Sequence, residues 1–438
     1  MLDLLIQNTT LIQSSKIISE RFSLGIKNKK IAFIGQEQLP IAKRYIAGSN
    51  LYTLPGIIDS HVHFRSPGFE HKEDFTSGSK AAIAGGVTTV FDMPNTSPPI
   101  DSVKKLEKKI KAIGGNSYVN FKQHFLLTNK NKEEIINLDS RSIATVKVFM
   151  AGHETANEVV YDSDYILEIA KILKEKGIIM SVHAEFQPSF EKRSVINTPE
   201  DYTKVKTRKA AIDAVEILIK IAIKTGCHIH VLHVSTIEEV QLLNKAKKEG
   251  VSISYEFIPP HLWFTCTDFH RNGWNYKLSP PLREEKDIAF LWEQVINNQV
   301  DLIGSDHAPH TVFEKKTLHP AGMPGVQELF NSMFTGLTRR GIDNIEAFKI
   351  IVRLLCENPS KMFNLKNKGI LLEGKDADIV LFSTQKKCDK KIHSKCKWSP
   401  FNYEEFKGNV ELTIVNGTIV YENGIVQQKV PGEGLGHI

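Results

Sequence analysis

The stretch LPGIIDSHVHFRSPG, Leu54 to Gly68, decides how the rest of the chain is interpreted. Its apolar start is typical of a buried strand, and it ends with His61, His63 and Arg65 at alternate positions. Residues i and i+2 of a strand point to the same side, so these three side chains can face one point as the strand ends. Such an arrangement suits a metal ion and an anionic group. Two partly exposed histidines at a strand end are the alternative interpretation.

The composition is ordinary for a soluble globular enzyme. Of the 438 residues, 41% are hydrophobic and 24% are charged. The net charge of +6 comes from lysines interleaved with acidic residues. No stripe of basic residues alternates with aromatic residues, so we expect no nucleic-acid partner. The five cysteines contain no C-x-x-C pair, which indicates free thiols in a reducing cytoplasm. With no signal-peptide pattern and no apolar run of bilayer length, we expect no membrane association.

The middle of the chain alternates strand-like runs with amphipathic helical stretches. We expect eight strands, at residues 54–64, 87–95, 118–128, 145–151, 178–185, 228–236, 251–257 and 300–307. Helices are expected between them, for example over 165–177 and 210–226, each ending at a glycine. This pattern predicts a (β/α)8 TIM-type barrel with its active site at the C-terminal ends of the strands. A doubly wound open sheet is the alternative, because strand order cannot be read from a sequence.

Both ends of the chain differ from this middle part. Residues 1–53 and 369–438 are rich in strand and turn patterns, including Asn-Gly pairs at 416–417 and 423–424 that indicate hairpins. We expect the two ends to pair into one small β-sandwich domain, with the barrel over residues 54–368.

Other metal-capable residues lie on the same predicted strands. They are Lys147 in the fourth strand, His183 in the fifth, His230 or His233 in the sixth, and Asp306 in the eighth. The C-terminal strand ends of a barrel open on one face, so these side chains would join the two histidines of the opening stretch. A lone buried histidine is usually structural and a lone buried lysine usually reaches solvent. Six such residues on one face favour a functional site.

A two-metal site requires these residue types. Neutral imidazoles and carboxylates bind zinc-like cations, and two neighbouring cations need an anionic bridge. Burial lowers the pKa of a lysine, so that its free amine can react with CO2; Lys147 would then become a bridging carbamate. The two metals would supply hydroxide from a bridging water, and Asp306 could carry its proton to a leaving nitrogen.

Several longer motifs together resemble the dihydroorotases of the amidohydrolase superfamily. They are HVHFRSPGFEHKEDFTSGSKAAIAGGVTTVFDMPNT from His61, VKVFM from Val146, SVHAE from Ser181, HVLHVST from His230, GSDHAPHTVFEKK from Gly304, KGILLEGKDADIVLF from Lys368 and SKCKWSPF from Ser394. The resemblance covers nearly the whole chain. It implies reversible cyclisation of N-carbamoyl-L-aspartate to L-dihydroorotate in pyrimidine biosynthesis, in a cytoplasmic homodimer.

The resemblance also implies a role for individual residues. It implies two zinc ions bridged by carboxylated Lys147 and hydroxide, with Asp306 as the catalytic proton carrier. It assigns the metal ligands His61, His63, Lys147, His183, His233 and Asp306. On the sixth strand it thus selects His233, and His228 and His230 are interpreted as structural.

The substrate carboxylate that does not react requires a cationic partner. Arg65 offers a bidentate geometry that lysine cannot copy. In the family, the arginine of H-x-H-x-R, the asparagine of M-P-N and the last histidine of D-H-A-P-H hold this carboxylate, which implies Arg65, Asn95 and His310. Without the resemblance, Asn95 would be interpreted as a turn residue before Thr-Ser-Pro-Pro.

Two positions depart from the family pattern in segments that shape the ring pocket. Pro260 precedes His261 where many relatives have two histidines, and Ser279 stands where several have asparagine.

Allantoinase and dihydropyrimidinase are the alternative activities, since they share the barrel and the metals. Arg65 favours dihydroorotase, because allantoinases usually have asparagine there and dihydropyrimidinases an apolar residue. A metal-free scaffold protein is a further alternative, but such relatives usually lack ligands, and none is missing here.

Overall fold

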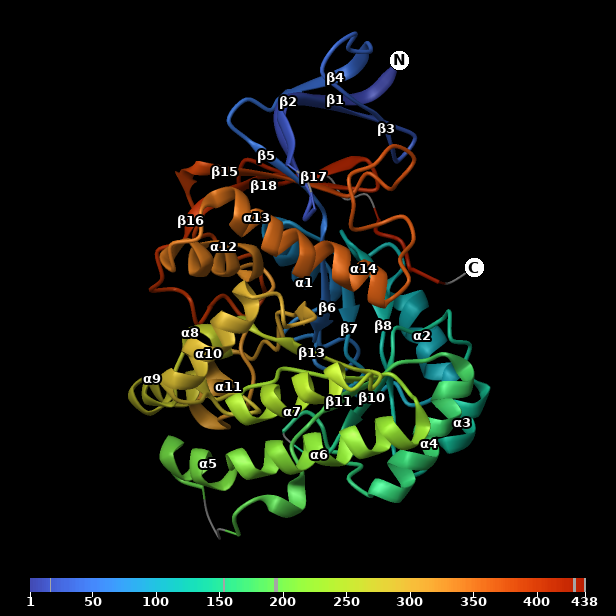
Figure 1. Cartoon of the computed structure of the whole chain (residues 1–438), viewed down its shortest axis with the longest axis vertical. Coiled ribbons are helices and arrows are strands. Elements are labelled where there is room, and N and C mark those ends of the chain that lie inside the picture. Colours follow the sequence, from blue (N-terminus) through green and yellow to red (C-terminus); the bar gives the residue numbers. More distant parts are fainter. Residues whose placement is uncertain (16, 153, 193–195, 428–430, 437–438) are drawn as a thin grey trace.

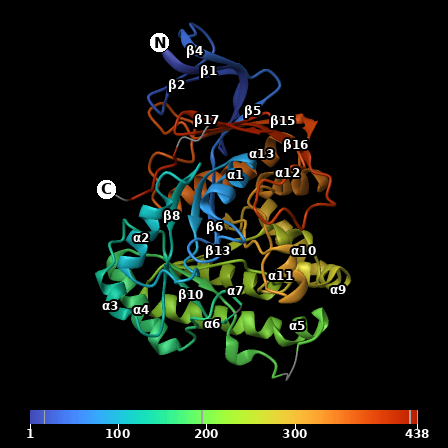
Figure 2. The same ribbon diagram turned by 180° about the vertical axis from the view of Figure 1, so that it is seen from behind.

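A computed structural model describes residues 1–15, 17–152, 154–192, 196–427 and 431–436 of the chain. Strands from both chain ends lie together at one end of the molecule, and the strands and helices of the middle of the chain form the larger body below them (Figure 1). The view from behind has the same arrangement (Figure 2). Among the helices of the described ranges, none is long and apolar enough to cross a membrane.

Short parallel strands form the wall of the central barrel. They are β6 (Ile57–Val62), β7 (Val87–Asp92), β8 (Asn120–Gln123), β9 (Phe125–Leu126), β10 (Val146–Phe149), β11 (Met180–His183), β12 (Ile229–Val231), β13 (Ile253–Phe257) and β14 (Leu302–Ile303). Pairing runs β6-β7-β8 in one sheet and β9 to β14 in sequence order in another.

The two sheets join on both sides, which closes the barrel. On one side, β8 and β9 are a single predicted strand interrupted only at His124, whose ring contacts Ser60 O and Thr145 Oγ1. On the other side, Val62 pairs with His307, and His63 N donates to His307 O at 2.8 Å. The predicted (β/α)8 barrel is therefore confirmed, and the open doubly wound sheet is excluded.

Helices cover the outside of the barrel and follow its strands (Figures 1 and 2). They are α1 (Phe75–Ala84), α2 (Val103–Ile113), α3 (Lys132–Asn137), α4 (Ser163–Lys176), α5 (Pro199–Val205), α6 (Arg208–Thr225), α7 (Ile237–Lys248), α8 (Pro259–Trp263), α9 (Cys266–Asn272), α10 (Glu285–Ile296), α11 (Val312–Thr317), α12 (Leu329–Arg339), α13 (Asn344–Val352) and α14 (Asn358–Met362). The helices expected over 165–177 and 210–226 are α4 and α6. They end at Gly177 and Gly226 in the left-handed conformation, as predicted.

Strands from both chain ends form one nine-stranded sheet. They are β1 (Leu2–Ile12), β2 (Ile17–Lys27), β3 (Lys30–Gly35), β4 (Ala42–Ala47), β5 (Tyr52–Pro55), β15 (Ile379–Lys387), β16 (Lys407–Val415), β17 (Thr418–Glu422) and β18 (Ile425–Val426). An apolar cluster that includes Leu4, Ile26, Ile379 and Ile414 joins the two halves. The expected β part built from both ends is confirmed. Its halves share one continuous sheet, because β5 pairs with both β1 and β15.

The two Asn-Gly pairs connect neighbouring strands of this sheet. Asn416 and Gly417 lie between β16 and β17, and Asn423 and Gly424 lie between β17 and β18. All four residues have positive φ, between 48° and 82°. This conformation is the one that two-residue hairpins require, so both hairpin predictions are confirmed.

Candidate active site

One pocket at the C-terminal ends of the barrel strands brings most of the predicted site residues together. Its lining includes the six predicted metal ligands and Arg65, followed by Phe149, Thr155, Leu278, Ser279, Ala308, Ala321 and Gly322. Asn95 and His310 do not line the pocket. They lie directly behind it, where Asn95 contacts His63 and His310 contacts Arg65.

Backbone turns beyond the strands, and not strand alternation alone, aim these side chains into the pocket. Strand β6 ends at Val62, so His63 and Arg65 lie past it. Arg65, His233 and Asp306 have φ values of 63°, 40° and 45°. Non-glycine residues rarely adopt this left-handed conformation, which costs roughly 1–3 kcal/mol per residue. The surrounding structure therefore holds three pocket residues in strained positions, as is common at functional sites.

Three of the pocket histidines have a fixed tautomer, because one ring nitrogen of each faces a side-chain oxygen. The contacts are His61 Nδ1 to Glu256 Oε1 at 2.5 Å, His63 Nδ1 to Asn95 Oδ1 at 2.8 Å, and His183 Nε2 to Glu185 Oε2 at 2.9 Å. Each of these oxygens accepts the ring N–H. In the neutral form of each ring the other nitrogen therefore carries a lone pair, which is the form that binds metals.

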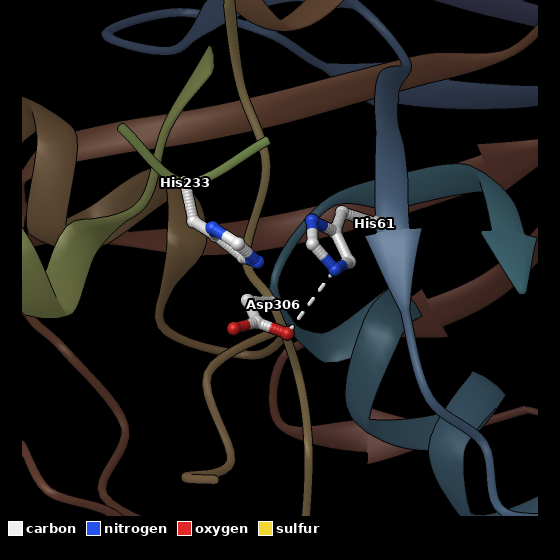
Figure 3. A group of neighbouring side chains, drawn as sticks. All are labelled: His61, His233 and Asp306. Carbon is white, nitrogen blue, oxygen red and sulfur yellow. Dashed lines mark ion pairs between the residues drawn. The ribbon is translucent and has the colours of Figure 1, made fainter. Parts of the chain in front are cut away.

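These lone pairs converge on a small volume, and two of them face a carboxylate oxygen there. His61 Nε2 and His63 Nε2 each lie 3.2 Å from Asp306 Oδ1, and His183 Nδ1 lies 3.0 Å from His233 Nε2. The side chains of His61, His233 and Asp306 point toward one another, with ligand atoms within 4.8 Å (Figure 3). The lone pairs of His61 and His63 and the carboxylate of Asp306 repel one another unless a cation lies between them. The donor set fits divalent metal ions.

Lys147 also fits a metal-bridging role. Its Nζ is buried and has no hydrogen-bond partner in the part of the chain that the structure describes, and it lies 4.4 Å from the ring centre of Phe149. Burial lowers the pKa of Lys147 to about 7, against the opposing effect of Asp306 and Glu256. A large share of the side chain is therefore free amine near neutral pH, which is the form that reacts with CO2.

Sequence reasoning missed the two carboxylates that orient His61 and His183. Burial alone would raise the pKa of Glu256, but His61 and His230 outweigh it, and the pKa lies below its usual range. Glu185 behaves in the same way beside Lys206 and His183. Both glutamates were visible in the sequence as acids in or next to buried strands, in ISYEF and SVHAE. A buried charge needs a partner, so these positions could have been flagged.

His228 and His230, before and within β12, have surroundings that differ from those of the pocket histidine His233. His230 contacts Ser254 Oγ at 2.9 Å and Glu256 Oε2 at 3.3 Å, and His228 contacts Ser254 Oγ at 2.8 Å. His233 lies past the end of the strand and lines the pocket.

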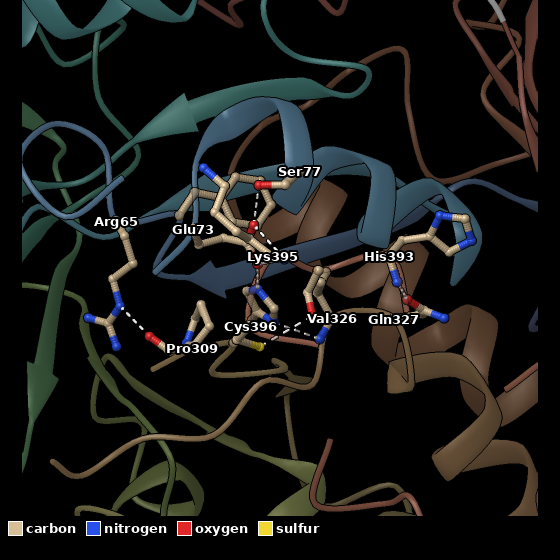
Figure 4. A network of polar contacts seen from close by, with 12 residues as sticks. Arg65, Glu73, Ser77, Pro309, Val326, Gln327, His393, Lys395 and Cys396 are labelled. Atoms are coloured by element: carbon tan, nitrogen blue, oxygen red, sulfur yellow. Dashed lines mark hydrogen bonds and ion pairs between the residues drawn. The ribbon is translucent and has the colours of Figure 1, made fainter. Parts of the chain in front are cut away.

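Arg65 forms the cationic end of the pocket. Its Nε donates to Pro309 O at 3.1 Å (Figure 4), its Nη1 lies 3.4 Å from Thr155 Oγ1, and its Nη2 lies 3.1 Å from His310 Nε2. Burial lowers the pKa of Arg65 to about 10, so the side chain is charged at neutral pH. None of these contacts is with a carboxylate. The pocket thus contains a buried cation suited to an anionic ligand.

The C-terminal motif SKCKWSPF holds the loops that carry the cationic end. Trp398 Nε1 donates to His310 O at 2.7 Å. Lys395 N donates to both carboxylate oxygens of Glu73 at 3.2 Å, and its side chain forms an ion pair with Asp74. Figure 4 shows Lys395 next to Glu73 and Ser77 at the start of α1. This segment therefore ties the loop after β6 to the loop after β14.

The two departures from the family pattern lie in different surroundings. Ser279 lines the pocket, and its Oγ lies 2.8 Å from Glu185 Oε2 and 2.5 Å from Lys206 Nζ. Pro260 lies in the first turn of α8, outside the pocket lining. The Ser279 hydroxyl therefore already has two hydrogen-bond partners, the two members of the Glu185–Lys206 ion pair.

Comparisons with known proteins agree with this geometry. Residues 52–420 match the Amidohydrolase family. The chain is 30% identical to a dihydroorotase of Lactobacillus gasseri, covering 96% of this chain and 99% of the relative. It is 31% identical to an allantoinase of Deinococcus radiodurans, covering 97% and 96%. A solved L-hydantoinase (dihydropyrimidinase) from Arthrobacter aurescens superposes with a TM-score of 0.91 at 27% identity, covering 98% of both chains. The chain belongs to the amidohydrolase family.

Proposed function

We propose that this protein is a dihydroorotase, a cyclic amidohydrolase that interconverts N-carbamoyl-L-aspartate and L-dihydroorotate. One observation carries the proposal: the buried Arg65, which pairs with no carboxylate in the described ranges, lines the same pocket as the converging histidines. A cyclic amide with a ring carboxylate matches both ends of that pocket. The similarity to dihydroorotases, an allantoinase and a hydantoinase supports a cyclic amide as the substrate class. A cytoplasmic homodimer acting in pyrimidine biosynthesis is part of the same proposal.

The metal centre in this proposal consists of two zinc ions. They would be held by His61, His63, Lys147 as its carbamate, His183, His233 and Asp306. When bound, such ions lower the pKa of a water molecule and polarise a carbonyl oxygen. The convergent lone pairs support this assignment, as does the amine of Lys147, which has no hydrogen-bond partner among the described residues.

The side chains around the substrate position it and move a proton. Arg65, with His310 behind it and Asn95 behind the neighbouring His63, holds the carboxylate and so turns the ring amide toward the histidines. Asp306 accepts a proton from the attacking water and delivers it to the ring nitrogen that leaves; ring closure is the reverse. Burial raises the pKa of Asp306 above its ordinary value, which suits a group that must hold a proton transiently.

The test is ring opening by zinc-loaded protein in bicarbonate buffer, with L-dihydroorotate, allantoin and dihydrouracil assayed side by side. We expect turnover of L-dihydroorotate in clear preference to the two neutral rings. Turnover of a neutral ring alone would contradict the role of Arg65 and favour the allantoinase or dihydropyrimidinase alternative. The similarity to an allantoinase and to a solved hydantoinase favours that alternative. Absence of any turnover with metal bound would favour a scaffold role.

A further inference from the structure

Lys72, on the loop after β6, contacts the imidazole ring of His310 at Nδ1, the nitrogen that does not face Arg65. Its Nζ lies 3.3 Å from His310 Nδ1 and 3.0 Å from Glu314 Oε1, and only 8% of the side chain is exposed. The Glu314 carboxylate is itself fixed, because its Oε2 accepts from Thr311 N at 3.0 Å in the first turn of α11. The ammonium group therefore has a defined position against the imidazole.

This contact fixes the tautomer of His310. An ammonium group can only donate, so Nδ1 of His310 must accept. Burial lowers the pKa of His310 well below its ordinary value, and the neighbouring cations Arg65, Lys72 and Lys315 lower it further, so the ring is neutral. A neutral imidazole has a single N–H. In His310 this N–H is therefore on Nε2.

The Nε2–H decides how the other side of the ring interacts. Nε2 lies 3.0 Å from Ala321 O and 3.1 Å from Arg65 Nη2. Because Nε2 carries the proton, it donates to the carbonyl and cannot accept from the guanidinium. Among the described residues, Arg65 Nη2 has no other acceptor. Arg65 and Ala321 both line the pocket, so a donor of Arg65 is available to a ligand there.

We propose that Lys72 is a positioning residue that keeps the proton of His310 on Nε2 and thereby leaves an Arg65 donor available for the substrate carboxylate. In the opposite tautomer, Nε2 would accept from Arg65 Nη2. The guanidinium would then be occupied by the protein, and Ala321 O would lose its donor. This inference rests on the proposed function only for the identity of the carboxylate.

The direct test is the tautomer of His310 in the ligand-free protein. Long-range proton–nitrogen correlation spectra of protein labelled with ¹⁵N-histidine distinguish Nε2–H from Nδ1–H, and the missing signals of His310→Gln assign the residue. We expect Nε2–H in the wild type and in Lys72→Gln, whose amide can still donate, and mainly Nδ1–H in Lys72→Met. A wild-type signal from Nδ1–H, or an unchanged tautomer in Lys72→Met, would overturn the inference.

Kinetics add a second readout that a general loss of stability would not produce. Losing a hydrogen bond to a charged group weakens binding by about tenfold or more, so Lys72→Met should raise KM for L-dihydroorotate by that factor with kcat nearly unchanged. Lys72→Gln should restore part of the affinity. The matched control is Lys368→Met, which removes another buried, ion-paired lysine, bonded to Asp378 at 2.5 Å. An equal KM increase in the control would contradict the proposed role.

The tautomer and the turnover test different claims. If the wild type has Nε2–H but does not open L-dihydroorotate, the proposed function fails and the positioning role of Lys72 stands. If L-dihydroorotate is opened but the wild type has Nδ1–H, the function stands and the role of Lys72 fails.

Discussion

The two ends of the pocket have opposite chemical requirements. At the histidine end, lone pairs of His61 and His63 face Asp306, so acceptors meet acceptors. At the arginine end, the donors of Arg65 contact no carboxylate of the described part of the chain, and Lys72 lies behind His310. The first end requires cations and the second requires an anion.

This difference indicates that the two ends of the pocket have separate roles. Metal ions at the histidine end would provide the reactivity, while the arginine end would select and orient the substrate. Both ends depend on groups behind the lining: Glu256 and Glu185 orient histidines, and Lys72 orients His310. Changes at one end should therefore leave the other end largely intact.

The largest effect is expected at Lys147. Lys147→Ala removes the only side chain proposed to bridge the metals, so activity should fall to background and most of the bound zinc should be lost. Zinc content of the purified variant and turnover of L-dihydroorotate measure both effects. Short carboxylic acids that replace the carbamate should restore part of the activity. Full zinc content together with full activity in this variant would contradict the bridge.

Asp306→Asn should separate proton transfer from metal binding. An amide cannot accept and deliver the proton, so kcat should fall by roughly 10² to 10⁴. Some zinc should remain, because the four histidines are unchanged. The measurement is kcat at known zinc occupancy, and wild-type kcat at full occupancy would exclude the proposed relay.

The pKa of Lys147 predicts a pH-dependent stability of the metal-free protein without CO2. The pKa is about 7 in the folded state and 10.5 is its ordinary value, so the unfolded state binds more protons between these values and stability rises with pH. The cost of burying Lys147 is then complete below pH 7, on the order of 5 kcal/mol, and disappears near pH 10.5. Lys147→Met removes this cost. Urea midpoints should favour the variant at pH 6.5 and converge by pH 10.5; a constant difference would contradict the shifted pKa.

A smaller effect is expected from Glu256→Gln. The amide oxygen can still accept from His61, but the charge that strengthens the imidazole as a ligand is lost. Metal affinity should fall by roughly 10- to 100-fold, measured by competition with a chelating dye. The control is Glu411→Gln, which changes a buried, ion-paired glutamate of the terminal sheet. Similar losses of metal affinity in both variants would indicate a general structural effect.

The sequence predicted the barrel well because its signals are local. Each of the eight strands coincides with an apolar run, and α4 and α6 end at the expected glycines. Asp306 was placed at the C-terminal end of a strand, which is the end of the barrel where the pocket lies. The domain limits at 53/54 and 368/369 and the roles of the site residues stay predictions.

The groups that orient the site side chains could not be predicted, because they depend on contacts between residues that are distant in the sequence. Glu256 meets His61 across 195 positions, and Lys72 meets His310 across 238. Only closure of the barrel brings these pairs together. The left-handed backbone of His233 was also invisible, so alternation could not choose between His230 and His233.

The separation of the two ends is tested most directly by Arg65→Met. The measurement is kcat/KM for L-dihydroorotate and for dihydrouracil, on wild type and variant at equal zinc content. We predict a loss of roughly 100-fold for L-dihydroorotate, as expected for a lost charged hydrogen-bonded pair, and little change for the neutral ring. Equal losses for both substrates, or an unchanged preference for L-dihydroorotate, would contradict the assignment of substrate selection to the arginine end.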